Sequence, residues 1–143
     1  MVTTALEQRQ ERFDLLVSNL EDSMAVLALV DLGVFNLLYK DAHSAQGLAH
    51  ETQTDAFRLS RFLNLAAGLG FIRKQGDLYA LYEEDKPLFD PHDRFSKGHR
   101  LSGFKRRLQN YGQAIEVLKS GVPLEVAGSG GDVSEKERRA FLT

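Results

Sequence analysis

The sequence predicts a mainly α-helical domain of the winged helix-turn-helix type, with a small β-hairpin wing and extra helices at both ends. Two observations favour this fold. Apolar residues recur at helical spacing over most of residues 1–120, interrupted by glycines and polar turns. Residues 71–81 then hold two short β-rich runs, FIRK and LYAL, around a turn that contains Gly76. The order helix, helix, turn, helix, hairpin is that of a winged helix.

Length and composition indicate one globular domain. The chain has 143 residues, of which 43% are hydrophobic and 27% charged, as in ordinary folded proteins. A net charge of −2 does not steer it toward nucleic acid. It contains no run long enough to span a bilayer, no secretion-signal pattern at its start and no cysteine. We therefore expect a cytoplasmic protein that does not act at a membrane.

Two helices are expected before the helix-turn-helix. Residues 6–20 have an apolar stripe at helical spacing, and Ser23 is a suitable N-cap for a second helix over residues 24–39. That second helix is apolar almost all round, since only Asp31 and Asn36 are strongly polar. Such a helix must be covered on more than one side, and in so small a domain we expect a second chain to cover one of them.

The next two helices form the helix-turn-helix. Ser44 and Asp55 are good N-caps, so we expect one helix after each of them. Gly68 and Gly70 suit the end of the second of these helices. The residues expected to face the core are Leu48, Ala49, Leu59, Phe62, Leu63 and Ala66.

The remaining sequence is expected to lead away from this domain. Residues 82–93 read as an acidic connector with one short helical turn, and residues 95–119 as a helical region broken near Gly103 or Gly112. We assign residues 1–120 to the winged-helix-like domain and residues 121–143 to a linker and the start of a helix. Because that helix meets Thr143 without a stop signal, we expect the chain to belong to a longer one.

A homodimer held by the first two helices is the main expectation for partners. The first helix has an apolar stripe with no obvious partner inside one chain, and a large exposed apolar patch is rare on soluble monomers. A two-fold contact between the same helices would bury it. The residues predicted to form the interface are Leu6, Phe13, Leu16, Leu20, Leu27, Val30, Val34 and Phe35.

We predict no catalytic, cofactor-binding or metal-binding residue in this chain. The Gly-rich residues 125–132 lack the following strand and acidic residue that a nucleotide loop needs. The four histidines have no paired helical spacing and no cysteine beside them, which disfavours a metal site. No serine–histidine–aspartate pattern or isolated carboxylate pair is evident.

Two basic regions allow a nucleic-acid interpretation, and we disfavour both. Arg58, Arg61 and Arg73 could contact DNA, but Asp55 and Asp77 lie at the tip of the reading helix and in the wing. Residues 94–107 interleave basic and apolar residues, as an RNA-binding or membrane-surface segment would. A packed amphipathic helix with basic side chains over its rim explains that pattern more simply.

Three segments resemble small-molecule O-methyltransferases of the plant caffeate and bacterial antibiotic type. They are AVLALVDLGVFNLL, SAQGLAHETQTDAFRLSRFLNLAAGLGFIRKQGDLYAL, and IEVLKSGVPLEVAGSGGD followed by RRAFLT. The sequence departs from that family's pattern at Gly47, Ala56 and Tyr82 and has no tryptophan. The resemblance implies a winged-helix-like dimerisation domain that exchanges helices with its twin and helps shape the substrate pocket.

The same resemblance places the S-adenosylmethionine site in a later Rossmann-like domain that this chain lacks. We therefore expect part of an S-adenosylmethionine-dependent O-methyltransferase that is inactive alone and meets its small-molecule substrate only with the catalytic domain. Two alternatives stay open at this stage. One is a winged-helix DNA-binding transcriptional regulator, and the other is a stand-alone dimerising scaffold protein.

Overall fold

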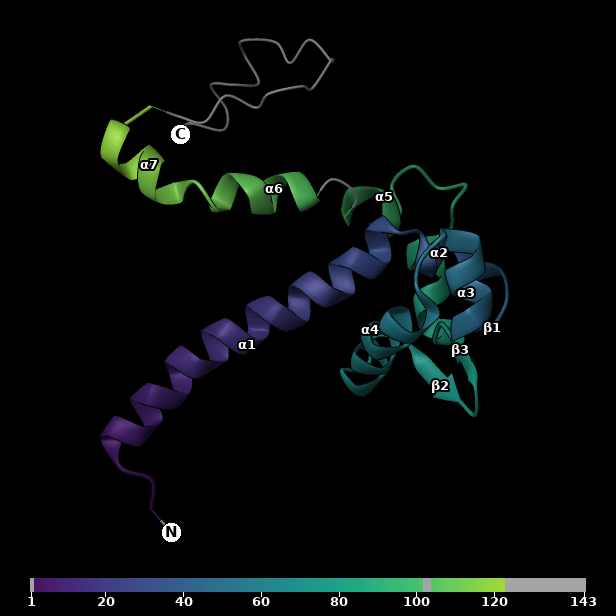
Figure 1. The fold of residues 1–143 in the computed structure, drawn as a ribbon, viewed down its shortest axis with the longest axis horizontal. Coiled ribbons are helices and arrows are strands. Elements are labelled where there is room, and N and C mark those ends of the chain that lie inside the picture. The colour runs from purple at the N-terminus through teal and green to yellow at the C-terminus, as the bar shows by residue number, and fades with distance from the viewer. Residues whose placement is uncertain (1, 102–103, 123–143) are drawn as a thin grey trace. The chain divides into compact units, whose positions relative to one another are not determined.

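The computed structural model of the chain describes residues 2–101 and 104–122. It is mostly helical with one small antiparallel sheet, which confirms the predicted fold class (Figure 1). The chain divides into two compact units, the first ending at Arg107 and the second starting at Leu108. Most of the predicted linker, with the Gly-rich loop and the helix expected from Ser134, lies outside the described residues. The predicted domain boundaries stay predictions.

The first helix is longer than the sequence suggested. Helix α1 runs without a break over Ala5–Asp31, so the prediction of two helices with Ser23 as a cap is wrong. The Ser23 hydroxyl donates to the backbone carbonyl of Asn19 at 2.6 Å, a bond that lets serine sit within a helix. The break comes instead at Gly33, whose φ of 82° few other residues adopt.

The predicted helix-turn-helix is present. The Ser44 side chain accepts the N–H of Gly47 at 3.0 Å, and the Asp55 carboxylate accepts the N–H of Arg58 at 2.8 Å, which confirms both caps. Gly70, with a φ of 85°, follows the end of the second helix of this pair, as expected. The helices after α1 are α2 (Val34–Lys40), α3 (Ala45–Thr52) and α4 (Ala56–Gly68).

The wing is a three-stranded sheet. Strands β2 (Arg73–Gln75) and β3 (Leu78–Ala80) form the predicted hairpin around Gly76, and the two-residue strand β1 (His43–Ser44) adds to the outer edge of β3. The Tyr79 hydroxyl donates to the Asn64 side-chain oxygen at 2.5 Å, and Lys74 donates to the same atom at 2.9 Å. These bonds tie the wing to α4.

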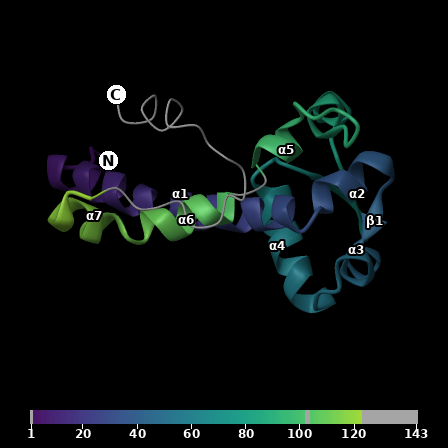
Figure 2. The ribbon, with the colours of Figure 1, turned by 90° about the horizontal axis from the view of Figure 1, so that it is seen from above.

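The core lies where the last turns of α1 meet the other elements of the first unit. Figure 2 shows α2, α3, α4 and α5 gathered around the C-terminal end of α1. Phe62 was expected in this core but is 43% exposed, because the buried row of α4 is Leu59, Leu63 and Ala66 and Phe62 lies beside it. The buried apolar residues are Val26, Leu29, Val30, Val34, Phe35, Leu38, Leu48, Ala49, Leu59, Leu63, Ala66, Ile72, Tyr79, Leu81 and Phe89.

The remaining described elements are short. The 3₁₀ helix η1 (Glu83–Phe89) occupies the predicted connector, and its Phe89 ring packs on Phe35 with centroids 4.7 Å apart. The predicted break near Gly112 is confirmed between the last two helices, whereas Gly103 lies outside the described residues. The helices after η1 are α5 (Lys97–Leu101), α6 (Phe104–Tyr111) and α7 (Ala114–Ser120).

One pair of helices has some character of a membrane span. No single helix among the described residues is long and apolar enough to cross a bilayer. Helices α1 and α2 together have the length and composition, but they are bent by 61° at their break. The core helix of a soluble protein can pass the same test, so this carries little weight.

Candidate functional site

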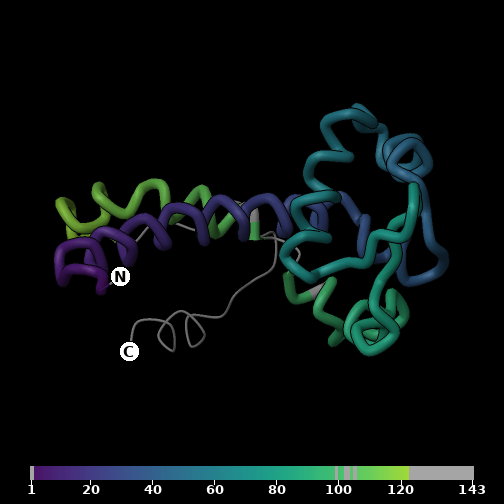
Figure 3. The backbone as a smooth tube through the Cα atoms, turned by 90° about the horizontal axis from the view of Figure 1, so that it is seen from below, coloured from purple at the N-terminus to yellow at the C-terminus, as the bar shows by residue number. Residues whose placement is uncertain are grey.

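The first half of α1 carries an apolar surface that its own chain leaves open. Every described residue from Val2 to Glu21 is exposed. Within the first unit, this half of α1 extends away from the other elements (Figure 3). The α1 stripe consists of Leu6, Phe13, Leu16 and Leu20, which are 69%, 65%, 66% and 53% exposed. Their spacings of seven, three and four residues put them on one side of the helix.

The eight residues predicted to contact a second chain differ in exposure. The four residues of the α1 stripe are exposed, and Leu27 is partly buried. Val30, Val34 and Phe35 are at most 8% exposed and belong to the core of one chain. Contact with a second chain stays a prediction for all eight. Helical spacing shows which residues are apolar and aligned, but it does not show whether they meet their own chain or another.

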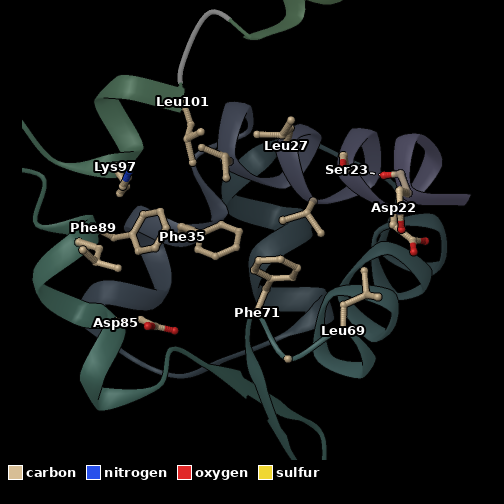
Figure 4. Close-up of a pocket in the computed structure, with 15 residues that line it drawn as sticks. Asp22, Ser23, Leu27, Phe35, Leu69, Phe71, Asp85, Phe89, Lys97 and Leu101 are labelled. Atoms are coloured by element: carbon tan, nitrogen blue, oxygen red, sulfur yellow. Dashed lines mark hydrogen bonds between the residues drawn. The ribbon is translucent and has the colours of Figure 1, made fainter. Parts of the chain in front are cut away.

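A groove opens beside the C-terminal half of α1. We call it the α1–η1 groove, and its volume is about 720 Å³. Figure 4 shows the rings of Phe35, Phe71 and Phe89 on one side of the hollow, with Leu27 and Leu101 above them. Its apolar wall consists of Val26, Leu27, Val30, Phe35, Leu69, Phe71, Leu88, Phe89 and Leu101, and its polar members are Asn19, Asp22, Ser23, Asp85 and Lys97.

The groove is accessible because several of its apolar side chains are only half covered. Leu69, Phe71 and Leu88 are 40%, 49% and 44% exposed. Leu69 and Phe71 come from the residues just after α4 and Leu88 comes from η1, so separate segments of the chain are needed to form this wall. The sequence analysis did not identify the groove, because no local pattern shows that these segments meet.

Charge is distributed unevenly around these two surfaces. Arg9 and Arg12 precede Phe13 and Leu16 by four residues each, and these four side chains line one hollow of the surface. The acidic residues of the same half of α1, Glu7, Glu11 and Asp14, form a row on the opposite side of the helix. The stripe therefore has basic neighbours, whereas the groove has both acidic and basic members, Asp22, Asp85 and Lys97.

Helix α4 presents a mixed surface where a DNA-reading helix would be polar and basic. Arg58 and Arg61 are exposed, but so are Phe57 at 72% and Leu65 at 38%. Exposed apolar side chains on the same helix as the arginines suit a protein surface better than a phosphate backbone. The absence of nucleic-acid binding nevertheless stays a prediction.

A metal site finds no support in the part of the chain that the structure describes. Within residues 2–101 and 104–122, no group of three or more histidine, aspartate or glutamate side chains is placed to hold a metal ion. The prediction that the chain has no catalytic, cofactor or metal residue is not tested by this observation.

Comparisons with known proteins agree with this geometry. A family model described as the O-methyltransferase dimerisation domain matches residues 15–86. That range covers half of the chain and includes the C-terminal half of α1, the helix-turn-helix and the wing. No curated protein matches the sequence.

Three of the solved structures with a similar fold are named as methyltransferases. One is N,N-8-amino-8-demethyl-D-riboflavin dimethyltransferase from Streptomyces davawensis, with 27% identity and a TM-score of 0.65 over 85% of this chain and 36% of that one. Mitomycin 7-O-methyltransferase has 22% identity and a TM-score of 0.68 over 96% and 43%. Human N-acetylserotonin methyltransferase has 18% identity and a TM-score of 0.69 over 99% and 46%. This chain thus spans less than half the length of each.

Proposed function

The chain belongs to the O-methyltransferase dimerisation domain family, and from that premise we propose that it joins two copies of itself through the α1 stripe. The observation that supports this proposal is the exposure of Leu6, Phe13, Leu16 and Leu20 on one side of one helix. A contact between two copies would remove this apolar surface from water. Two-fold symmetry would let the same helix serve in both chains.

Burying the stripe would contribute a free energy of the same size as the cost of association. Burying a fully exposed large apolar side chain contributes about 1.5–3 kcal/mol. Four such side chains from each of two copies, each roughly two-thirds exposed, would contribute about 8–16 kcal/mol. Association costs about 4–15 kcal/mol in lost translational and rotational freedom. The two ranges overlap, so the dimer needs most of the stripe and should be sensitive to one charge placed in it.

For the longer protein we propose a cytoplasmic methyltransferase that uses S-adenosylmethionine and acts on a small molecule. The fold shared with three solved methyltransferases supports this proposal. Those three are named for three different small molecules, so we propose no particular substrate. In this proposal the chain itself supplies association and part of the pocket wall, and another domain supplies the cofactor site and the chemistry.

Substituting one leucine in the stripe tests the proposed dimer. Leu16→Glu would place a carboxylate among the apolar side chains of the stripe. Arg12, four residues earlier on the helix, would offset only part of the cost of burying that charge, so we expect the dissociation constant to rise about a hundredfold or more. Sedimentation velocity over a range of concentrations measures it. Leu15→Glu is the matched control, because Leu15 is also exposed, at 49%, but points away from the stripe. Equal weakening by both variants, or by neither, would contradict the proposed surface.

A further inference from the structure

We propose that the outer surface of α4 is a docking site for another protein, which binds it through a helix that carries carboxylates among apolar side chains. We call this surface the α4 patch. It consists of Phe57, Arg58, Arg61, Phe62, Leu65 and Leu69. The patch is separate from the α1 stripe, so the inference goes beyond the proposed function and does not rest on it.

The α4 patch is an apolar surface along one side of the helix. Phe57, Phe62, Leu65 and Leu69 are 72%, 43%, 38% and 40% exposed. Phe57, Leu65 and Leu69 recur at multiples of four residues, and the patch extends about 18 Å along α4. Large apolar side chains that are exposed side by side mark an interaction surface, whereas scattered ones do not. The length of the patch suits a second helix laid along α4.

The charge of the α4 patch is positive and unbalanced by its own chain. Helix α4 contains no aspartate or glutamate, and both Arg58 and Arg61 are exposed. Within the part of the chain that the structure describes, neither guanidinium makes an ion pair or a hydrogen bond. The carboxylate of Asp55, just before the helix, accepts the backbone N–H of Arg58 at 2.8 Å and caps α4. The complementary surface is therefore apolar with carboxylates beside its apolar side chains.

A protein helix fits this pattern better than a bilayer or a nucleic acid does. Anionic bilayers are bound by clusters of about four to eight basic residues, whereas the patch has two arginines and the chain has a net charge of −2. Duplex DNA is held by many phosphate contacts, which the apolar side chains between these arginines cannot make. Aromatic residues and arginine together are instead typical of the centre of a protein interface.

A pair of synthetic helical peptides tests the charge of the partner. Both peptides have leucines at helical spacing, with glutamates beside them in one and lysines in the other. By fluorescence anisotropy we expect the chain to bind the glutamate peptide and not the lysine peptide. Arg61→Glu should weaken binding of the glutamate peptide at least about tenfold and confer binding of the lysine peptide, because the charge is exchanged.

Arg73→Glu is the matched control for this change of charge. Arg73 is exposed on β2, and the side chain of the next residue, Lys74, donates to Asn64 of α4. Because neighbouring side chains of a strand point to opposite faces, Arg73 points away from α4. We expect Arg73→Glu to leave the affinity for the glutamate peptide unchanged. Equal weakening by Arg61→Glu and Arg73→Glu would show that only net charge matters and would overturn the proposed site.

A second pair of variants tests the apolar part of the patch. Phe57→Ala removes a ring that is 72% exposed, and Phe95→Ala removes one outside the patch that is 64% exposed. We expect Phe57→Ala to weaken binding of the glutamate peptide about tenfold and Phe95→Ala to leave it unchanged. Circular dichroism checks that each variant is folded. The exposure of both rings favours folding, and Leu65→Ala replaces Phe57→Ala if the latter is not folded.

The remaining outcomes separate this inference from its alternatives and from the proposed dimer. No binding of the glutamate peptide would overturn it, and so would tighter binding to phosphatidylglycerol vesicles or duplex DNA that Arg61→Glu abolishes. If Arg61→Glu or Phe57→Ala dissociates a wild-type dimer in sedimentation velocity, the patch belongs to the contact between copies and the inference is wrong. A wild-type chain that is monomeric but binds the glutamate peptide as described would overturn the proposed dimer and support the docking site.

Discussion

Thr4 and Glu7 hold the first turn of α1 by a reciprocal pair of hydrogen bonds. The Glu7 carboxylate accepts the backbone N–H of Thr4 at 2.7 Å, and the Thr4 hydroxyl accepts the N–H of Glu7 at 3.2 Å. The hydrogen bond from the Thr4 backbone is the main reason that the pKa of Glu7 lies below its ordinary value. The hydrogen bond with the Thr4 side chain lowers this pKa further. The turn stabilised in this way contains Leu6, the first residue of the α1 stripe.

Acidification should loosen the start of α1. Because the pKa of Glu7 is lower in the folded chain, its stabilising contribution is present above the unfolded pKa and is lost as the pH falls through the folded pKa. We expect the amide signals of residues 4–8 to shift toward unfolded values below about pH 4 in an NMR titration. Thr4→Ala should raise the pKa of Glu7, and Thr3→Ala should not. A Glu7 titration that is the same in both variants would contradict this account.

At the scale of elements, the turn between α1 and α2 depends on one glycine. Gly33 has a φ of 82°, and a Cβ added there would meet no atom within 4 Å. Only the backbone conformation therefore opposes a side chain. We expect Gly33→Ala to lower the free energy of unfolding by about 1–2 kcal/mol, measured in urea at fixed protein concentration.

Gly68 provides the control for that measurement. It ends α4, and a Cβ there would also meet nothing within 4 Å, but its φ is not positive. Gly68→Ala should leave stability unchanged or raise it by up to about 1 kcal/mol, because alanine favours a helix. If both variants destabilise the chain equally, the left-handed conformation of Gly33 is not what limits that site.

Elements whose ends are marked by local chemistry could be predicted from the sequence. Ser44, Asp55 and Gly70 act at the helix ends as their residue types suggest, and Gly76 turns the hairpin. The capping box at Thr4 was missed although its threonine-x-x-glutamate pattern was readable. Strand β1 was missed because two residues are too few to carry a periodic pattern.

Features that depend on distant segments could not be predicted in this way. The α1–η1 groove joins α1, α2, the residues after α4, η1 and α5, and the sequence shows none of these contacts. Val34 and Phe35 are buried in the core of one chain, which helical spacing alone did not show, and their contact with a second chain stays a prediction. The α1 stripe could be predicted because it lies within one helix and needs only helical spacing.

At the scale of the whole molecule, the sheet formed by the described residues differs from the sheets on which nucleotide-type cofactors bind. Nucleotide-type ligands bind at the carboxyl ends of parallel strands in an α/β sheet, whereas the sheet described here is antiparallel. We therefore expect no binding of S-adenosylmethionine by the chain alone, measured by isothermal titration calorimetry. Saturable binding at micromolar concentration, with one site per chain, would contradict this expectation and assign a direct role in methyl transfer.

The account as a whole depends on association of two copies, and the mass of the wild-type chain in solution tests this most directly. One chain has a mass of 16.0 kDa, so a dimer has twice that mass, 32.0 kDa. Size-exclusion chromatography with multi-angle light scattering measures the mass without reference to shape. We expect 32.0 kDa at micromolar concentration, whereas a mass of 16.0 kDa that does not change with concentration would contradict the account.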